Sequence, residues 1–188
     1  MNILGDNDME KYAVIVVDML NDFVTGALAC DRAKAIVPHV ERLVETARAK
    51  DIPVIFANDC HLSGIDHELK LWGDHAIKGT KGAEVIAELG PEETDFVVPK
   101  RRYSGFFKTD MELLLKELGV DTVVICGLHV HMCCRHTAAD AYCLGYDIVV
   151  PRQTTDSFTE EDFNSGIKYL EEVYGAKICD LDDFIARI

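Results

Sequence analysis

Short apolar runs typical of β-strands alternate with helical patterns from one end of this chain to the other, and no other sequence feature constrains its fold as strongly. Residues 12–17 form a continuous apolar run, as expected of a strand that is buried on both faces. A single helical stripe follows, formed by Ile36, Val37, Val40, Leu43, Val44 and Ala47. Regular alternation of this kind predicts a parallel sheet with helices on both faces.

The rest of the chain continues the same pattern. Further strands are predicted over residues 53–57, 95–99, 122–126, 147–150 and 176–179. Helices are predicted over residues 82–89, 109–118, 133–144 and 160–174, with a last helix running to Ile188. The expected fold is therefore an α/β three-layer sandwich with a mostly parallel six-stranded sheet. No repeat or linker divides the chain, so we expect a single domain over residues 1–188, with residues 1–10 as a polar N-terminal arm.

Charge and composition exclude several classes of function. A net charge of −14 at pH 7 argues against nucleic acid or an anionic membrane as a partner, because both would repel an acidic surface. No apolar run approaches the roughly 18 residues that a membrane-spanning helix requires. The first ten residues are acidic and polar, unlike a signal peptide, and we expect a cytoplasmic protein. The seven cysteines show no repeated spacing that would indicate a disulfide framework.

A histidine-rich loop follows the second predicted strand. Asp59 and His61 are two residues apart, so in an extended segment their side chains point to the same side. His67 and His75 come soon after them on the same loop. Such a set can hold a divalent transition metal through nitrogen and oxygen ligands. The alternative is a solvated polar loop, but the clustering after a strand favours the metal.

Four reactive residues are expected at one edge of the sheet, because ligands of parallel α/β sheets bind at the carboxyl ends of the strands. Asp18, Asp59 and Lys100 follow the first three predicted strands, and Cys133 lies seven residues beyond the fourth. Taken singly, each is explained as a turn, solvated or buried residue. Taken together, they suggest a nucleophilic thiol whose pKa is lowered by a helix N-terminus and a lysine, with an aspartate to carry its proton. Backbone N–H groups of residues 127–132 can form an oxyanion hole.

At these residues the chain resembles the isochorismatase-like cysteine hydrolases, and most closely their nicotinamidase branch, over nearly its whole length. The family's catalytic aspartate, lysine and cysteine fall on Asp18, Lys100 and Cys133. The motif around the nucleophile matches Gly127, Cys133 and Thr137. The resemblance therefore implies that Asp18, Lys100 and Cys133 form the catalytic triad of a cysteine-dependent amidase.

The resemblance also implies the surroundings of that triad. The oxyanion hole would consist of the N–H groups of His129 and Cys133, beside a cis peptide bond that joins Leu128 to His129. The metal ligands would be Asp59, His61 and His75, with His67 as a fourth. The aromatic residues that sandwich the pyridine ring in the nicotinamidase branch match Phe23, Trp72 and Tyr103.

The implied activity is hydrolysis of nicotinamide to nicotinate and ammonia through a thioester, with a divalent metal ion, zinc in the first place and iron or manganese as alternatives. The implied partners are a small-molecule amide substrate and further copies of the chain in a homo-oligomer. Val130, His131 and Cys134 depart from the residues common in relatives, so an N-carbamoyl amidase of the same family is an alternative. A non-catalytic protein that uses the metal and thiols for ligand binding or redox sensing is another.

Overall fold

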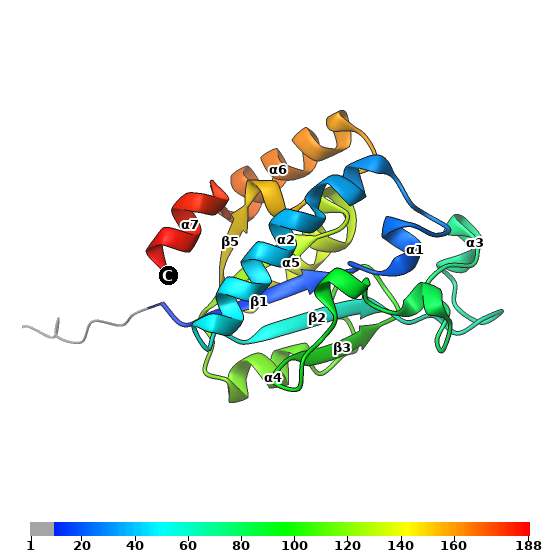
Figure 1. The fold of residues 1–188 in the computed structure, drawn as a ribbon, viewed down its shortest axis with the longest axis horizontal. Helices are drawn as coiled ribbons and strands as arrows, with labels where there is room; N and C mark the ends of the chain where they lie inside the picture. The colour runs from blue at the N-terminus through cyan, green and yellow to red at the C-terminus, as the bar shows by residue number, and fades with distance from the viewer. Residues whose placement is uncertain (1–9) are drawn as a thin grey trace, which may run out of the picture.

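The structure, a computed structural model, describes residues 10–188. Six parallel strands form one sheet in the order β3-β2-β1-β4-β5-β6, which confirms the predicted α/β fold (Figure 1). Strand β1 therefore lies near the centre of the sheet, between β2 and β4. The strands are β1 (Tyr12–Val17), β2 (Val54–Asp59), β3 (Phe96–Lys100), β4 (Thr122–Gly127), β5 (Asp147–Pro151) and β6 (Lys177–Cys179).

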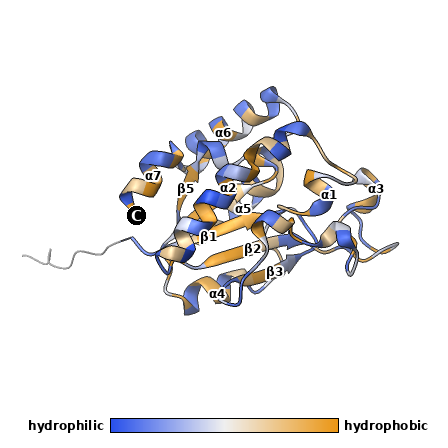
Figure 2. Cartoon of the chain, in the orientation of Figure 1, coloured by the Kyte–Doolittle hydropathy of each residue, from blue (hydrophilic) through white to orange (hydrophobic). Residues whose placement is uncertain are grey.

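Helices cover both faces of the sheet and complete the three layers (Figure 1). One face is packed against α2 (Asp31–Ala49) and α7 (Leu181–Arg187). The other face is packed against α4 (Met111–Glu117), α5 (Arg135–Cys143) and α6 (Glu160–Tyr174). Figure 2 shows that apolar residues dominate the central strands, whereas the helices are apolar over only part of their surface.

Strand β1 separates two hydrophobic cores. Val14 and Val16 belong to the core beneath α2, and Ala13, Ile15 and Val17 belong to the core on the opposite face. All five side chains are fully buried, which explains why the sequence of this strand is apolar without alternation. Burying each valine or isoleucine side chain contributes roughly 1.5–3 kcal/mol. The rim residues described below are therefore attached to the most firmly packed strand of the sheet.

The prediction of a helix over residues 82–89 is wrong. Two short 3-10 turns, η1 (Lys81–Ala83) and η2 (Ala87–Leu89), take its place. The chain between them is extended, and the N–H of Ile86 donates to the carbonyl of Met19 at 3.1 Å. Because these backbone groups are bonded to the loop after β1, they are unavailable for the i to i+4 bonds of an α-helix.

The carboxyl ends of β1, β2 and β3 point toward the end of the molecule where α1 (Asn21–Val24) and α3 (Leu69–Trp72) lie (Figure 1). Within residues 10–188, no helix is both long and apolar enough to cross a membrane. Of the polar arm predicted over residues 1–10, only Glu10 lies within the described part of the chain.

Candidate active site

Three charged side chains from three adjacent strands meet at the carboxyl edge of the sheet. The ammonium group of Lys100 lies 2.7 Å from Asp18 Oδ2 and 2.6 Å from Asp59 Oδ1. Parallel pairing of β2 with β3 sets Asp59 directly opposite Lys100. The other carboxylate oxygen of Asp18 accepts the backbone N–H of Asp59 at 2.7 Å. All three residues are at most 1% exposed, so one buried cation bridges two buried carboxylates.

The pKa values of these groups differ because their neighbours differ. Burial and the charge of Asp59 raise the pKa of Asp18 to about 6, against the opposing effect of Lys100. Burial would also raise the pKa of Asp59, but Lys100 and His61 outweigh it and lower that pKa. Burial opposes the charge of Lys100, yet the two carboxylates raise its pKa well above the usual value. At neutral pH, Asp18 is therefore the carboxylate of this pair that most readily takes up a proton.

The thiol of Cys133 is the fourth member of this edge. Its sulfur and one carboxylate oxygen each of Asp18 and Asp59 all lie within 4.8 Å of one another. Burial, together with the two carboxylates, raises the pKa of the Cys133 thiol well above its usual range, although Lys100 lowers it. The expectation that this pKa is lowered overall is therefore wrong, because burial outweighs the lowering effect of Lys100. The carboxylate of Asp18 lies beside the thiol.

The helix predicted from residue 133 begins at Arg135, and Cys133 lies instead in the preceding π-helical turn, η3 (Val130–Cys134). This turn separates the two adjacent cysteines. The sulfur of Cys134 lies 3.8 Å from Thr155 Oγ1, and burial raises the pKa of its thiol to about 12. Cys133 is the cysteine that the turn directs to the carboxylates.

The loop before that turn is shaped by Gly127. This residue has φ of 98°, and a Cβ added to it would lie 2.1 Å from the carbonyl oxygen of Val17. The following peptide bond that joins Leu128 to His129 is cis, as the resemblance implies. Within residues 10–188, neither His129 nor Cys133 donates a backbone hydrogen bond outside its own helical turn. The N–H of His129, which lies before this turn, therefore has no backbone acceptor in this range and is available to an oxyanion.

A second buried set of side chains adjoins the first, and we call it the donor group: Asp59, His61, Glu68 and His75. One donor atom from each residue lies within 4.8 Å of the others. Oδ2 of Asp59 is 3.6 Å from Nε2 of His61 and 4.0 Å from Nε2 of His75. Neither Oδ2 of Asp59 nor Nε2 of His61 has a hydrogen-bond partner in the described part of the chain. Buried polar atoms without partners are unusual, and a bound cation would satisfy them.

The Nδ1 atoms of His61 and His75 are hydrogen-bonded to groups outside the donor group. Nδ1 of His61 lies 3.1 Å from Oδ2 of Asp66, and Nδ1 of His75 donates to the carbonyl of Gly73 at 2.9 Å. Asp66 also accepts hydrogen bonds from Arg101, which lower the pKa of that carboxyl. Metal-bound histidines are typically oriented in this way through the ring nitrogen that does not bind the metal. The structure therefore directs both Nε2 atoms into the donor group.

The donor group differs from the predicted ligand set at one position. His67 is exposed and lies outside the group, and Glu68 takes the fourth place with 8% of its surface exposed. Burial and the charge of Asp59 raise the pKa of Glu68 to about 7. Adjacent residues of a turn point in different directions, so only one of these two side chains can face inward. The sequence prediction named the histidines of this loop and did not include the carboxylate of Glu68, the residue next to His67.

The three aromatic residues expected to contact substrate, Phe23, Trp72 and Tyr103, line one small space together with Cys133. We call this space the inner cavity. Its volume is about 10 Å³, room for a single water molecule. Nε1 of Trp72 donates to the hydroxyl of Tyr103 at 2.9 Å. The other residues that line the cavity are Leu28, Asp59, Glu68, His75, His129, Met132 and Phe158.

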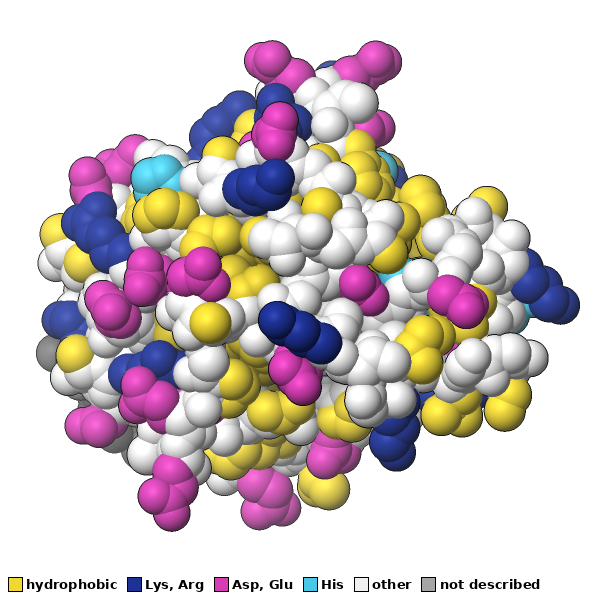
Figure 3. All heavy atoms as spheres, turned by 45° about the vertical axis from the view of Figure 1, so that its right-hand side comes forward, with side chains coloured by type: hydrophobic (Ala, Val, Ile, Leu, Met, Phe, Trp, Pro, Cys, Tyr) yellow, Lys and Arg dark blue, Asp and Glu magenta, His cyan; other side chains and the backbone are white. Residues whose placement is uncertain are grey.

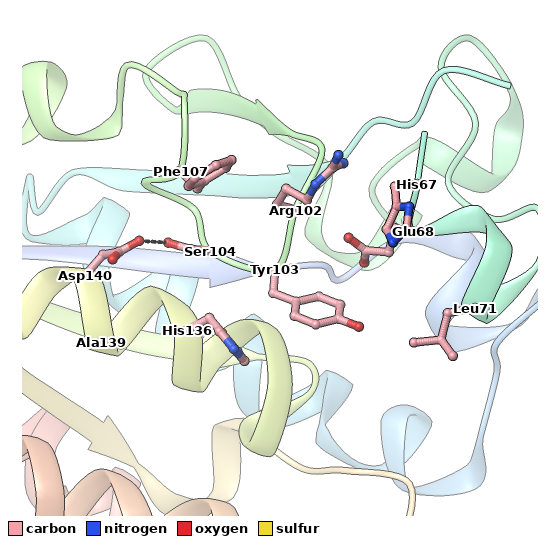
Figure 4. A pocket seen from close by; sticks show the side chains of 10 residues that line it. All are labelled: His67, Glu68, Leu71, Arg102, Tyr103, Ser104, Phe107, His136, Ala139 and Asp140. Carbon is pink, nitrogen blue, oxygen red and sulfur yellow. Dashed lines mark hydrogen bonds between the residues drawn. The ribbon is translucent and has the colours of Figure 1, made fainter. Parts of the chain in front are cut away.

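A wider depression of about 580 Å³ lies beside the inner cavity and shares Glu68 and Tyr103 with it. We call this the outer pocket. Figure 4 shows that its side chains come from α3 and the segment before it, from the loop after β3, and from α5, with Ser104 hydrogen-bonded to Asp140. In the view of Figure 3, apolar side chains reach the surface among acidic and basic ones, and little imidazole surface is visible.

Comparison with known proteins agrees with this geometry. A family model described as the isochorismatase domain matches residues 12–183. The chain is similar to the crystal structure of an N-carbamoylsarcosine amidase from Thermoplasma acidophilum, at 39% identity and a TM-score of 0.86, over 92% of this chain and 97% of that chain. It is similar to a nicotinamidase from Bacillus subtilis at 32% identity and a TM-score of 0.86, over 90% of this chain and 99% of that chain.

Two further similarities bear on the metal and on activity. A pyrazinamidase of Pyrococcus horikoshii, solved in complex with zinc, is 29% identical with a TM-score of 0.84, over 90% of this chain and 99% of that chain. A protein of Arabidopsis thaliana that is described as a probable inactive nicotinamidase is 36% identical, over 86% of this chain and 88% of that protein.

Proposed function

Because this chain belongs to the isochorismatase family, we propose that it is a cysteine-dependent amidohydrolase that converts nicotinamide to nicotinate and ammonia. The observation that carries the proposal is the position of the Cys133 thiol, which lies beside Asp18 and next to the donor group. A thiol with an adjacent base is the requirement for nucleophilic catalysis, and the similarity to amidases of small molecules indicates the bond that is attacked.

The first half of the reaction forms a thioester. Asp18 takes the proton of Cys133, and the sulfur attacks the carboxamide carbon. Lys100 holds Asp18 in place and favours the negative charge that moves from the carboxylate to the sulfur. The N–H groups of His129 and Cys133 stabilise the oxyanion, a contribution of about 10²–10³ in rate for each donor. Asp18 then returns the proton to the leaving nitrogen, and ammonia departs as the carbon–nitrogen bond breaks.

The second half consumes water. Asp18, again a carboxylate, accepts a proton from a water molecule that attacks the thioester carbon. The carbon–sulfur bond breaks and the proton returns from Asp18 to the sulfur of Cys133. The product leaves as nicotinic acid, which becomes nicotinate by giving its carboxyl proton to ammonia or to water. No residue outside the triad changes its protonation over the complete cycle.

The donor group fits a divalent ion, since it offers two imidazoles and two carboxylates and includes buried atoms without partners. We propose zinc, with iron or manganese as alternatives, and the zinc complex of a pyrazinamidase relative supports this choice. Bound there, the ion supplies a Lewis-acidic site that holds the nitrogen of a pyridine ring. His61 and His75 would bind through Nε2, with Asp59 and Glu68 as the oxygen ligands.

Ammonia release tests the proposal. The wild type is assayed with nicotinamide, with benzamide, which lacks the ring nitrogen, and with N-carbamoylsarcosine, each with and without a chelator. We expect hydrolysis of nicotinamide that chelation abolishes, with benzamide a poor substrate. Cys133→Ala should be inactive, whereas Cys134→Ala serves as the matched control and should retain activity. Nicotinamide turnover by Cys133→Ala would place the nucleophile elsewhere.

An N-carbamoyl amidase is the second candidate, and the N-carbamoylsarcosine amidase that is 39% identical over 92% of this chain favours it. Turnover of N-carbamoylsarcosine that is insensitive to chelation, with nicotinamide untouched, would replace the first proposal by this one. Turnover of none of the three amides, with one tightly bound metal ion, would favour a non-catalytic binding protein. We also propose a homo-oligomer in the cytoplasm, and sedimentation that shows only a 21.0 kDa species would refute self-association.

A further inference from the structure

A phenylalanine that the sequence did not single out covers the inner cavity. The ring of Phe158 stacks on the imidazole of His129, with 3.9 Å between centroids and 29° between planes. It also stacks against Trp72, with 6.0 Å between centroids and 19° between planes. Phe158 therefore joins two walls of the cavity whose floor includes the thiol of Cys133.

The cavity is closed to substrate while Phe158 holds this position. A volume of about 10 Å³ holds at most one water molecule, and a ring-bearing amide contains many more atoms. Cys133 is 3% exposed, so its sulfur is buried behind the residues that line this cavity. Turnover therefore requires that at least one wall of the cavity moves.

Of the rings of Phe23, Trp72 and Phe158, that of Phe158 is held neither by a hydrogen bond nor by deep burial. Trp72 is hydrogen-bonded to Tyr103, and Phe23 is 5% exposed in the core beneath α2. Phe158 is half-buried, and its ring has no polar atom through which it could be held. The backbone beside it is anchored, because the fully buried Ser157 contacts His131 through its hydroxyl. Rotation of the side chain alone can therefore open the cavity while the chain around it stays in place.

The imidazole beneath Phe158 gives an independent reason to expect an open form. His129 is 1% exposed, and neither of its ring nitrogens has a hydrogen-bond partner in the described part of the chain. Burial and the nearby His131 lower its pKa to about 3, so the ring is neutral and carries one donor and one acceptor that are both unused. Such groups are costly when buried, and departure of the Phe158 ring would let water or a polar ligand reach them.

We propose that Phe158 is a specificity-determining residue, whose side chain sets the size of the amide that reaches Cys133 by covering His129 until the ligand displaces it. This inference rests on the proposed function, since it takes the sulfur of Cys133 as the atom that a substrate must reach. Substrates are then small planar amides whose ring can take the place that Phe158 leaves beside Trp72.

Alkylation of Cys133 tests the size limit without reference to any substrate. The rates for iodoacetamide and for the bulkier N-phenylmaleimide are measured by peptide mass mapping in the wild type, in Phe158→Ala and in Phe158→Leu. We expect Phe158→Ala to raise the maleimide rate by at least about tenfold more than the iodoacetamide rate, with Phe158→Leu intermediate. Phe107→Ala is the matched control, because Phe107 lines the outer pocket and not the inner cavity, and neither rate should change.

Two results would overturn the inference. One is that neither alkylation rate changes in Phe158→Ala. The other is an equal rise of both rates with a lower melting temperature, which would assign Phe158 a structural role only. The same variants are then assayed with nicotinamide and with ring-substituted carboxamides. A size limit in alkylation without any amide turnover would refute the proposed function and keep the role of Phe158, so the two failures are distinguishable.

Discussion

Replacement of Lys100 by methionine tests the two buried ion pairs that Lys100 forms with Asp18 and Asp59 most directly. The substitution keeps an unbranched side chain of similar length and removes only the ammonium group. Two carboxylates at 2.6 and 2.7 Å from that group would then be buried without a counter-ion. Removing one partner of a buried ion pair typically costs 3–5 kcal/mol, a large part of the roughly 5–15 kcal/mol that stabilises a domain. We expect a loss of about 3–5 kcal/mol at pH 7.

The loss should depend on pH in a defined direction. Without the ammonium group the pKa of each carboxyl rises, so Lys100→Met gains protons at a higher pH than the wild type does. The difference in stability is therefore largest at neutral pH and shrinks as the pH falls through about 6 toward 4, where protonation removes the uncompensated charges.

Urea denaturation of chelated protein at several pH values measures this difference. Lys116→Met is the control, since Lys116 pairs with Glu112 on the exposed face of α4, and no measurable change is expected there. A cost for Lys100→Met that is below about 1 kcal/mol, or one that does not vary between pH 7 and pH 5, would refute the account of a buried bridge.

Three further outcomes are expected. The value of kcat/KM should fall as the pH drops below about 6, because burial and Asp59 raise the pKa of Asp18 to about 6 and a protonated Asp18 cannot take the thiol proton; a pH–rate profile without this acidic limb would contradict its role as base. Asp66→Asn should weaken metal binding by about 10–100-fold through loss of the hydrogen bond to His61, whereas His67→Ala should leave it unchanged, as metal titration would show. Gly127→Ala should lower the free energy of unfolding by more than Gly119→Ala does, because both residues have positive φ but only at Gly127 would the added Cβ lie 2.1 Å from a carbonyl oxygen; equal losses in chemical denaturation would contradict this.

The fold was accessible from the sequence because the central strands β1, β2 and β4 are apolar and buried on both faces, and the longer helices α2 and α6 each carry one apolar stripe. The helix predicted over residues 82–89 does not form although the apolar spacing fits one, because backbone groups of Glu84 and Ile86 are hydrogen-bonded to Asn21 and Met19 in the segment after β1. The positions of Asp18, Asp59 and Lys100 could be predicted because they come at the ends of three strands, and the carboxyl ends of parallel strands lie at one edge of the sheet.

Other parts of the site depend on contacts that periodicity does not encode. Glu68 was missed because the direction of a side chain in an irregular segment follows from packing. Phe158 was missed because nothing in its neighbourhood marks it, and its contact with His129 spans 29 residues of chain. The predicted direction of the Cys133 pKa shift was wrong, because the effect of desolvation depends on how deeply the thiol is buried and the sequence does not reveal that depth.

The contacts among Asp18, Asp59 and Lys100 also have a consequence for how the chain folds. Lys100 and Asp59 are 41 residues apart, as are Asp59 and Asp18, so the contacts among these three residues all join distant segments of the chain. Such contacts close long loops and form only when β1, β2 and β3 have come together. A partly folded chain thus contains the residues of the site, but they are not brought together and no activity is expected. Recovery of activity during refolding should accordingly coincide with completion of the sheet, and turnover would serve as a kinetic reporter of the native topology.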